Sequence, residues 1–200
     1  MVYIALAALI SGIICGMLQI GGPPAALLVA YKENILDLLM LSVGISIGMQ
    51  QGLWDKIKRY HIKSLLIPAG VVIGSFLGGI ICCLLTGYPL ADGTAIACSM
   101  GWYSLGGITI ESLSGAFMGG VAFLSNLMRE ILSFFSIAFL SRRLNYPSCI
   151  AAAGATSEDT TLPMMMKYTN EESVVLSVLN GMICSALVPF LITACYSIFM

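Results

Sequence analysis

The sequence predicts an all-α polytopic membrane protein with about five transmembrane helices and two re-entrant or discontinuous helical hairpins of opposite orientation. Of its 200 residues, 58% are hydrophobic and 10% are charged, whereas charged residues make up about a quarter of a soluble domain. The mean hydropathy is +0.96. A soluble domain of this length leaves roughly 30% of its surface exposed to water, so a chain this apolar needs a lipid bilayer as its solvent.

Five runs are long and apolar enough to be spans, because a bilayer crossing takes about 20 residues. They cover residues 2–19, 35–51, 65–86, 116–140 and 173–199. The first run has neither a basic segment before it nor a cleavage motif after it, so we expect a retained span and no signal peptide. We expect residues 1–200 to form a single transmembrane domain.

Two further segments, residues 90–113 and 146–166, are apolar at their edges and interrupted by glycine, proline or polar residues. Short cytoplasmic loops collect basic residues, which here lie before the third span and after the fourth, at Lys56, Lys58, Arg59, Lys63, Arg142 and Arg143. A full crossing by residues 90–113 would place the last two outside. We therefore expect this segment to enter and leave on the outer face, and residues 146–166 to enter from the cytoplasm.

The fourth span contains two charges, Arg129 and Glu130, at bilayer depth. Charges there are costly and usually face a cavity or a partner. Asn126, Arg129, Glu130 and Ser133 are spaced i, i+3, i+4 and i+7, which gathers them on one helical stripe. We expect this stripe to face water or the protein interior. The alternative is a structural salt bridge that locks two helices together.

The second hairpin contains a polar stretch, residues 154–163, between apolar flanks. Its carboxylates are Glu158 and Asp159, and its hydroxyls include Thr156, Ser157 and Thr160. Irregular backbone at membrane depth is tolerated where it is buried in protein or lines a water-filled cavity. Broken helices of this kind form substrate sites in transporters. The alternative is a polar loop outside the membrane.

The first hairpin has glycines around two aromatic residues, Trp102 and Tyr103, followed by Ser104 and Glu111. This pattern indicates an unwound tip with an aromatic face, which can hold an ammonium group by cation–π attraction. The same pair of rings would also suit an aromatic belt at the membrane surface.

Several function classes are excluded by what the chain lacks. The net charge of −1 leaves no basic face for nucleic acid. The single histidine lies in a basic loop, so no Ser/His/Asp set is available and we expect no enzyme. The seven cysteines have no C-x-x-C spacing, so we expect neither a metal nor a cofactor.

Three motifs resemble those of the LysO-type lysine exporter family of prokaryotic membrane proteins. They are Gly101-Trp102-Tyr103-Ser104 with Gly106-Gly107, Asn126 through Glu130 with Arg142-Arg143, and Gly154-Ala155-Thr156-Ser157 with Asp159, Thr161, Leu162 and Pro163. They occur in the family's order over most of the chain. The resemblance implies a multi-pass protein of the cytoplasmic membrane that exports lysine or a related cationic amino acid. It also points to Glu130 and Asp159 as an intramembrane acidic pair, while Glu158 departs from the family's usual uncharged residue.

The chain resembles the C-terminal two thirds of that family, as in its split forms. A small membrane protein of roughly 95 residues would then supply the missing N-terminal spans, which is about three spans of ~20 residues with their connections. Whether such a complex dimerises stays open.

Our hypothesis from the sequence is a secondary transporter whose cavity is lined by the fourth span and the two hairpin tips. The carboxylates would bind the ammonium groups of lysine, and helix N-termini near residues 101–104 or 156–160 would bind its carboxylate. Protons or other cations that compete for the same carboxylates would provide exchange. The alternatives are a structural or regulatory membrane subunit, a transporter of another amino acid or cation, and an intramembrane hydrolase with paired aspartates.

Overall fold

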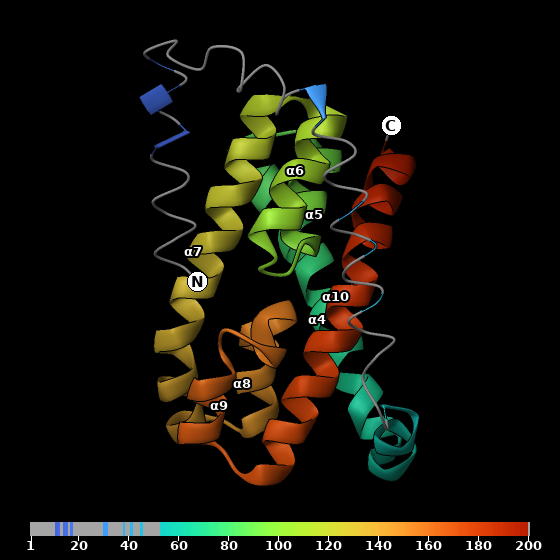
Figure 1. The fold of residues 1–200 in the computed structure, drawn as a ribbon, viewed down its shortest axis with the longest axis vertical. Helices are drawn as coiled ribbons and strands as arrows, with labels where there is room; N and C mark the ends of the chain where they lie inside the picture. The colour runs from blue at the N-terminus through green and yellow to red at the C-terminus, as the bar shows by residue number, and fades with distance from the viewer. Residues whose placement is uncertain are drawn as a thin grey trace. The chain divides into compact units, whose positions relative to one another are not determined.

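The computed structural model describes residues 53–199, with side chains from Leu65 onward, and single positions between Ser11 and Ile45. The spans expected at 2–19 and 35–51 therefore lie outside the described residues. Within residues 53–199 all regular structure is helical, which confirms the all-α prediction (Figure 1).

Three helices contain stretches that are long and apolar enough to cross a membrane, at Leu65–Thr86, Ala116–Arg143 and Glu171–Phe199. They confirm the third, fourth and fifth predicted spans. The helices of residues 53–199 are α4 (Leu53–Thr86), α5 (Leu90–Cys98), α6 (Tyr103–Ser114), α7 (Ala116–Arg143), α8 (Tyr146–Ala153), a 3-10 helix η1 (Gly154–Glu158), α9 (Leu162–Tyr168) and α10 (Glu171–Phe199).

Helices α5 and α6 form the first hairpin, hairpin 1, between α4 and α7. Small residues allow close packing on both sides, since a Cβ on Gly79 of α4 would lie 2.7 Å from the Cα of Thr94, and one on Gly107 would lie 3.2 Å from the Cβ of Phe123. Helix α6 turns directly into α7 at Gly115, whose φ is +92°. Hairpin 1 therefore has its base at the N-terminal end of α7 and its tip, residues 99–102, halfway along it.

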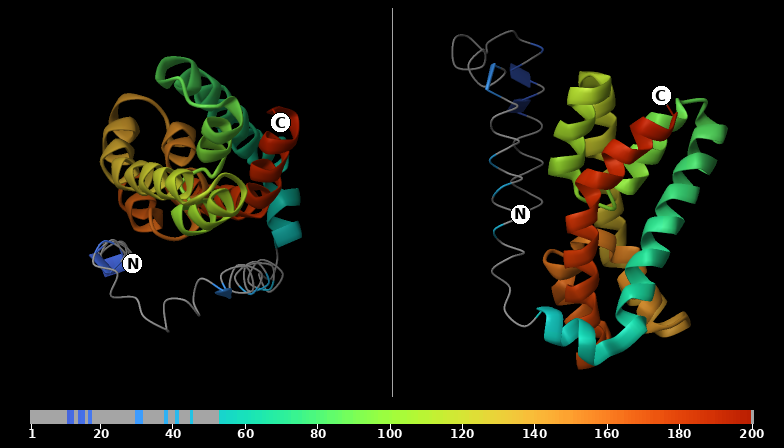
Figure 2. Two further views of the ribbon diagram at one scale, coloured as in Figure 1. Left: turned by 90° about the horizontal axis from the view of Figure 1, so that it is seen from above. Right: turned by 90° about the vertical axis from the view of Figure 1, so that its right-hand side faces the viewer.

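Helices α8, η1 and α9 form the second hairpin, hairpin 2, at the other end of α7 (Figure 2). The Asn145 side chain caps α8 by accepting the Ser148 N–H at 2.9 Å. Helix α8 then runs antiparallel to α7, with the Ser133 hydroxyl donating to the Ala152 carbonyl at 3.0 Å. Buried Met165 of α9 belongs to the same apolar cluster as Ile137 of α7. The two hairpins thus approach each other from opposite ends of α7.

The two tips meet in the middle. The Ala155 N–H of hairpin 2 donates to the Met100 carbonyl of hairpin 1 at 3.0 Å. Helix α10 runs past both hairpins, because its first half bonds to η1 through Ser177 and its last turns bond to α5 through Tyr196. The tips and the middles of α7 and α10 therefore form the polar centre of the described bundle.

Candidate functional site

Glu130 is the central residue of this polar centre. It lies on α7 with only 1% of its side chain exposed, on the same buried stripe as Asn126 and Ser133. Neither of its carboxylate oxygens has a hydrogen-bond partner among the described residues. A buried, unpaired carboxylate is costly, so it indicates a place that binds a proton or a cation.

Asn126 fixes the tip of hairpin 1. Its Oδ1 accepts the Gly101 N–H at 2.8 Å, and its Nδ2 donates to the carbonyls of Ile96 at 3.2 Å and Ala122 at 2.9 Å. One amide therefore bridges the break between α5 and α6. Asn126 acts on the backbone, and these three bonds occupy both ends of its side chain.

Asn180 plays the corresponding part for hairpin 2, although it lies outside the three sequence motifs. Fully buried on α10, it donates from Nδ2 to the Gly154 carbonyl at 2.9 Å and to the Ser157 hydroxyl at 3.0 Å. Ser157 and Ser177 also exchange hydroxyl-to-carbonyl bonds of 2.8 and 2.7 Å. The signal in the sequence was a lone amide in the middle of an apolar run.

Tyr103, Asp159 and Thr160 gather near Glu130. Asp159 lies close enough to act on Glu130 as a like charge, and the Thr160 hydroxyl is the nearby potential hydrogen-bond donor. Both carboxylates also act as charges on the Tyr103 hydroxyl. The Tyr103 ring packs edge-on against Phe123, with 5.2 Å between centroids. Asp159 is exposed and accepts bonds from the backbone N–H and the hydroxyl of Thr160. The structure thus brings the two predicted acidic residues into one region, one buried and one open.

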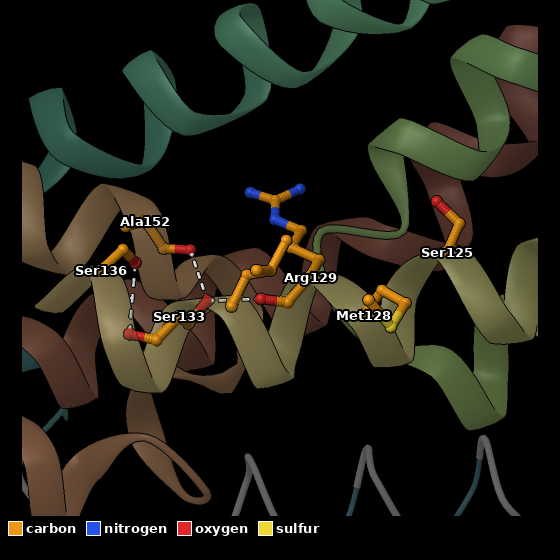
Figure 3. Close-up of a pocket in the computed structure, with 7 residues that line it drawn as sticks. Ser125, Met128, Arg129, Ser133, Ser136 and Ala152 are labelled. Carbon is orange, nitrogen blue, oxygen red and sulfur yellow. Dashed lines mark hydrogen bonds between the residues drawn. The ribbon is translucent and has the colours of Figure 1, made fainter.

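Arg129 points elsewhere. Its Nη1 donates to the Ser75 hydroxyl of α4 and to the Ala97 carbonyl of α5, both at 3.3 Å. Figure 3 shows the side chain leaving α7 toward the ribbon of α4. Two open grooves flank it, one between α7 and α8 and one along α4. Arg129 and Glu130, which the sequence analysis placed on one stripe, therefore serve different neighbours.

Glu158 faces α10. The Ser185 hydroxyl donates to its Oε1 at 2.8 Å. A Cβ on Gly181 would lie 2.6 Å from the Glu158 Cβ, so this carboxylate packs closely on the helix. Of the two neighbouring acids at the tip, Glu158 is bonded to the last span while Asp159 lies in the region of Glu130.

The other predicted site residues are distributed as follows. Thr156 donates its hydroxyl to the Ala153 carbonyl at 2.9 Å, which stabilises the turn of the tip. Trp102 and Ser104 are half-buried at the start of α6. Glu111 lies near the far end of α6, where its Cβ would be 2.5 Å from a Cβ on Gly119. The structure does not bring Glu111 to the tips.

Comparison with known proteins gives the family. The family model described as "Lysine exporter LysO" matches residues 6–196. The lysine exporter LysO of Escherichia coli is 33% identical over 161 residues, which is 80% of this chain and 53% of that protein. A Haemophilus influenzae protein named "Putative lysine exporter" is 30% identical over 158 residues, 79% of this chain and 80% of that protein.

The chain thus spans about half the length of the Escherichia coli relative. No solved structure matches it significantly. Because the family model covers nearly the whole sequence, the chain belongs to the lysine exporter LysO family.

Proposed function

We propose that this chain carries the cation-binding centre of a secondary transporter that exports lysine, or a related cationic amino acid, across the cytoplasmic membrane. The observation that supports it most is Glu130, a buried carboxylate without a hydrogen-bond partner beside the meeting point of two helical hairpins. Intramembrane ionisable residues of this kind mark substrate and ion pathways. The names of the relatives agree with this cargo.

Each charge of lysine has a counterpart in this proposal. Glu130 binds one ammonium group and Asp159 the other, while the ring of Tyr103 offers a face for either. The α-carboxylate of lysine lies at the start of α6, where the N-terminal end of the helix carries a partial positive charge that favours an anion. A proton or another cation that occupies Glu130 excludes the ammonium group, so release of one drives binding of the other.

The hairpins would serve as re-entrant elements. Their bases lie at opposite ends of α7, and their tips join through the Ala155–Met100 bond. In many transporters the substrate site lies at the bilayer midplane between two inverted elements, and access alternates by movement of one against the other. Lysine would reach Glu130 from the cytoplasm past hairpin 2 and leave past hairpin 1.

We further propose a heteromeric complex. Because the chain matches about half of the Escherichia coli relative, a small membrane protein of roughly 95 residues would supply the N-terminal spans, about three of ~20 residues each. Asp159 is exposed on the described part of the chain. Additional spans there would close the cavity around the cargo.

The test is lysine efflux. Cells that carry this chain and the companion protein are loaded with a lysine-containing dipeptide, and lysine appearing outside is measured over time. We expect Glu130→Gln and Asp159→Asn to abolish efflux, because each removes one negative charge from the site. Glu172→Gln, at an exposed position in the first turn of α10, is the matched control and should export normally.

Unchanged efflux in both site variants would refute the proposed site. Competition by ornithine, arginine and neutral amino acids then defines the cargo, because a site with two carboxylates should reject substrates that carry no side-chain cation. A chain that only holds helices together would show no efflux in any of these strains, with or without the substitutions.

A further inference from the structure

Two helices have their C-terminal, carbonyl-bearing ends at the point where the tips meet. Helix α5 runs toward the tip of hairpin 1 and ends at Cys98, and α8 runs toward the tip of hairpin 2 and ends at Ala153. The C-terminal end of a helix carries a partial negative charge from its aligned peptide dipoles. The Ala155–Met100 bond brings both ends into one small region. Two negative ends this close together should repel each other.

The Arg129 guanidinium lies at this meeting point. It donates to the Ala97 carbonyl in the last turn of α5 at 3.3 Å. A Cβ on Gly154, the residue that ends α8, would lie 3.0 Å from its Nη2. The bond to Ser75 at 3.3 Å holds the same group against α4. The guanidinium therefore donates to the carbonyl end of α5 and lies against Gly154, the residue that ends α8.

This placement explains why the adjacent acid stays unpaired. Neighbouring residues of a helix diverge by about 100°, so Arg129 reaches the helix ends while Glu130 lies on the buried stripe with Asn126 and Ser133. If the guanidinium instead neutralised Glu130, the carboxylate would have a partner, and neither of its oxygens has one among the described residues.

We propose that Arg129 is a positioning residue whose positive charge holds the carbonyl ends of α5 and α8 together, and thereby fixes both tips beside Glu130 without pairing with it. Its effect on transport rests on the function proposed above; its effect on the tips does not. Two other roles are distinguishable by experiment: a salt bridge with Glu130, and a direct ligand for the carboxylate of the cargo.

The first measurement is independent of transport. Met100→Cys and Ala155→Cys are introduced together into the full chain, and the oxidised peptide that joins them is quantified by mass spectrometry. We expect Arg129→Gln to lower its yield by about tenfold, the upper range for a charge at a helix end. Arg129→Lys should retain the yield, because the charge remains. Arg142→Gln, exposed in the last turn of α7, is the matched control.

A charge supplied from α4 should substitute for Arg129. The groove along α4, lined by Gly70, Gly74 and Gly78, has room for a longer side chain beside Ser75. Ser75→Lys combined with Arg129→Gln should therefore restore the cross-link. A salt bridge or a cargo ligand at position 129 gives no reason for such recovery. Equal cross-linking in Arg129→Gln and the unsubstituted chain, or no recovery with Ser75→Lys, overturns the proposal.

The second measurement is the concentration dependence of lysine efflux. Arg129→Lys should keep KM within about twofold of the unsubstituted chain, because an ammonium compensates the helix ends as a guanidinium does. A tenfold higher KM in this variant would identify Arg129 as a ligand of the cargo and would overturn the proposal. If Arg129→Gln alone does not accumulate, Arg129→Lys and the double variant Ser75→Lys with Arg129→Gln still test the proposal. If the unsubstituted chain exports no lysine, the proposed function fails while the cross-link still tests Arg129.

Discussion

At the scale of single residues, Arg129 is separated from the other three polar residues of the α7 stripe more clearly than their spacing in the sequence suggests. Asn126, Glu130 and Ser133 lie within about 60° of one another around the helix, while Arg129 lies about 40° outside this arc and about 100° from Glu130. A long side chain at the edge can reach the neighbouring helix, and Arg129 bonds to α4. The buried stripe therefore contributes the carboxylate of Glu130 and two positioning side chains, Asn126 and Ser133, to the interior. The Arg129 guanidinium points to α4.

Gly154 is the residue whose substitution should separate the tips most directly. Its φ is +64°, and a Cβ there would lie 2.7 Å from the Met100 carbonyl oxygen. Gly154→Ala should lower the free energy of unfolding by about 1–3 kcal/mol and abolish efflux, because the tip would have to move. Gly78→Ala is the control: nothing lies within 4 Å of its Cβ, and alanine favours a helix by about 1 kcal/mol. Thermal unfolding in detergent measures both, and equal stabilities would contradict the tip geometry.

At the scale of elements, α10 connects the two hairpins. Its first half holds hairpin 2 through Ser177 and Asn180. Beyond the internal Pro189, the Tyr196 hydroxyl donates to Oδ1 of Asp92 on α5 at 2.6 Å, with both side chains buried. Movement of one hairpin against the other therefore has to bend α10 or break one of these bonds.

The Tyr196–Asp92 bond can be removed without changing the shape of the side chain. Tyr196→Phe leaves a buried carboxylate short of a donor, and we expect the free energy of unfolding to fall by about 1.5–3 kcal/mol, the range for bonds to charged groups. Tyr88→Phe, at a residue that is 42% exposed, should change little. A melting temperature for Tyr196→Phe equal to that of Tyr88→Phe would show that this bond does not hold α10 to hairpin 1.

The same elements explain what the sequence could predict. The spans and the two interrupted segments follow from run length and local composition. The spans predicted at 65–86, 116–140 and 173–199 accordingly match the helical stretches Leu65–Thr86, Ala116–Arg143 and Glu171–Phe199. The bond between Asn180 and Gly154 joins residues 26 positions apart on elements that are not neighbours in sequence. The tip contact between Met100 and Ala155 is equally non-local. Such pairings depend on how helices pack, which periodicity and composition do not determine.

At the scale of the whole molecule, orientation follows from the hairpins and can be tested without transport. Because α6 turns into α7 at Gly115 and α5 begins at Leu90, both ends of hairpin 1 should face one side of the membrane. Arg142 and Arg143 predict that the other end of α7 faces the cytoplasm. Single cysteines at Tyr88 and Leu113 should therefore react with a membrane-impermeant thiol reagent added to intact cells, and cysteines at Leu144 and Lys167 only in inverted vesicles.

These four positions are all exposed on the described chain, so packing does not hide them. The native chain, in which Cys15 and Cys82 are exposed, provides the baseline for labelling. Reaction of Tyr88→Cys and Leu113→Cys from opposite sides would mean that α5 and α6 cross the membrane as one broken helix. That result would place Arg142 and Arg143 outside, against the attraction of basic loops to the cytoplasm. Labelling of both from outside would instead leave the tip contact at membrane depth, where Glu130 needs a cation or a proton.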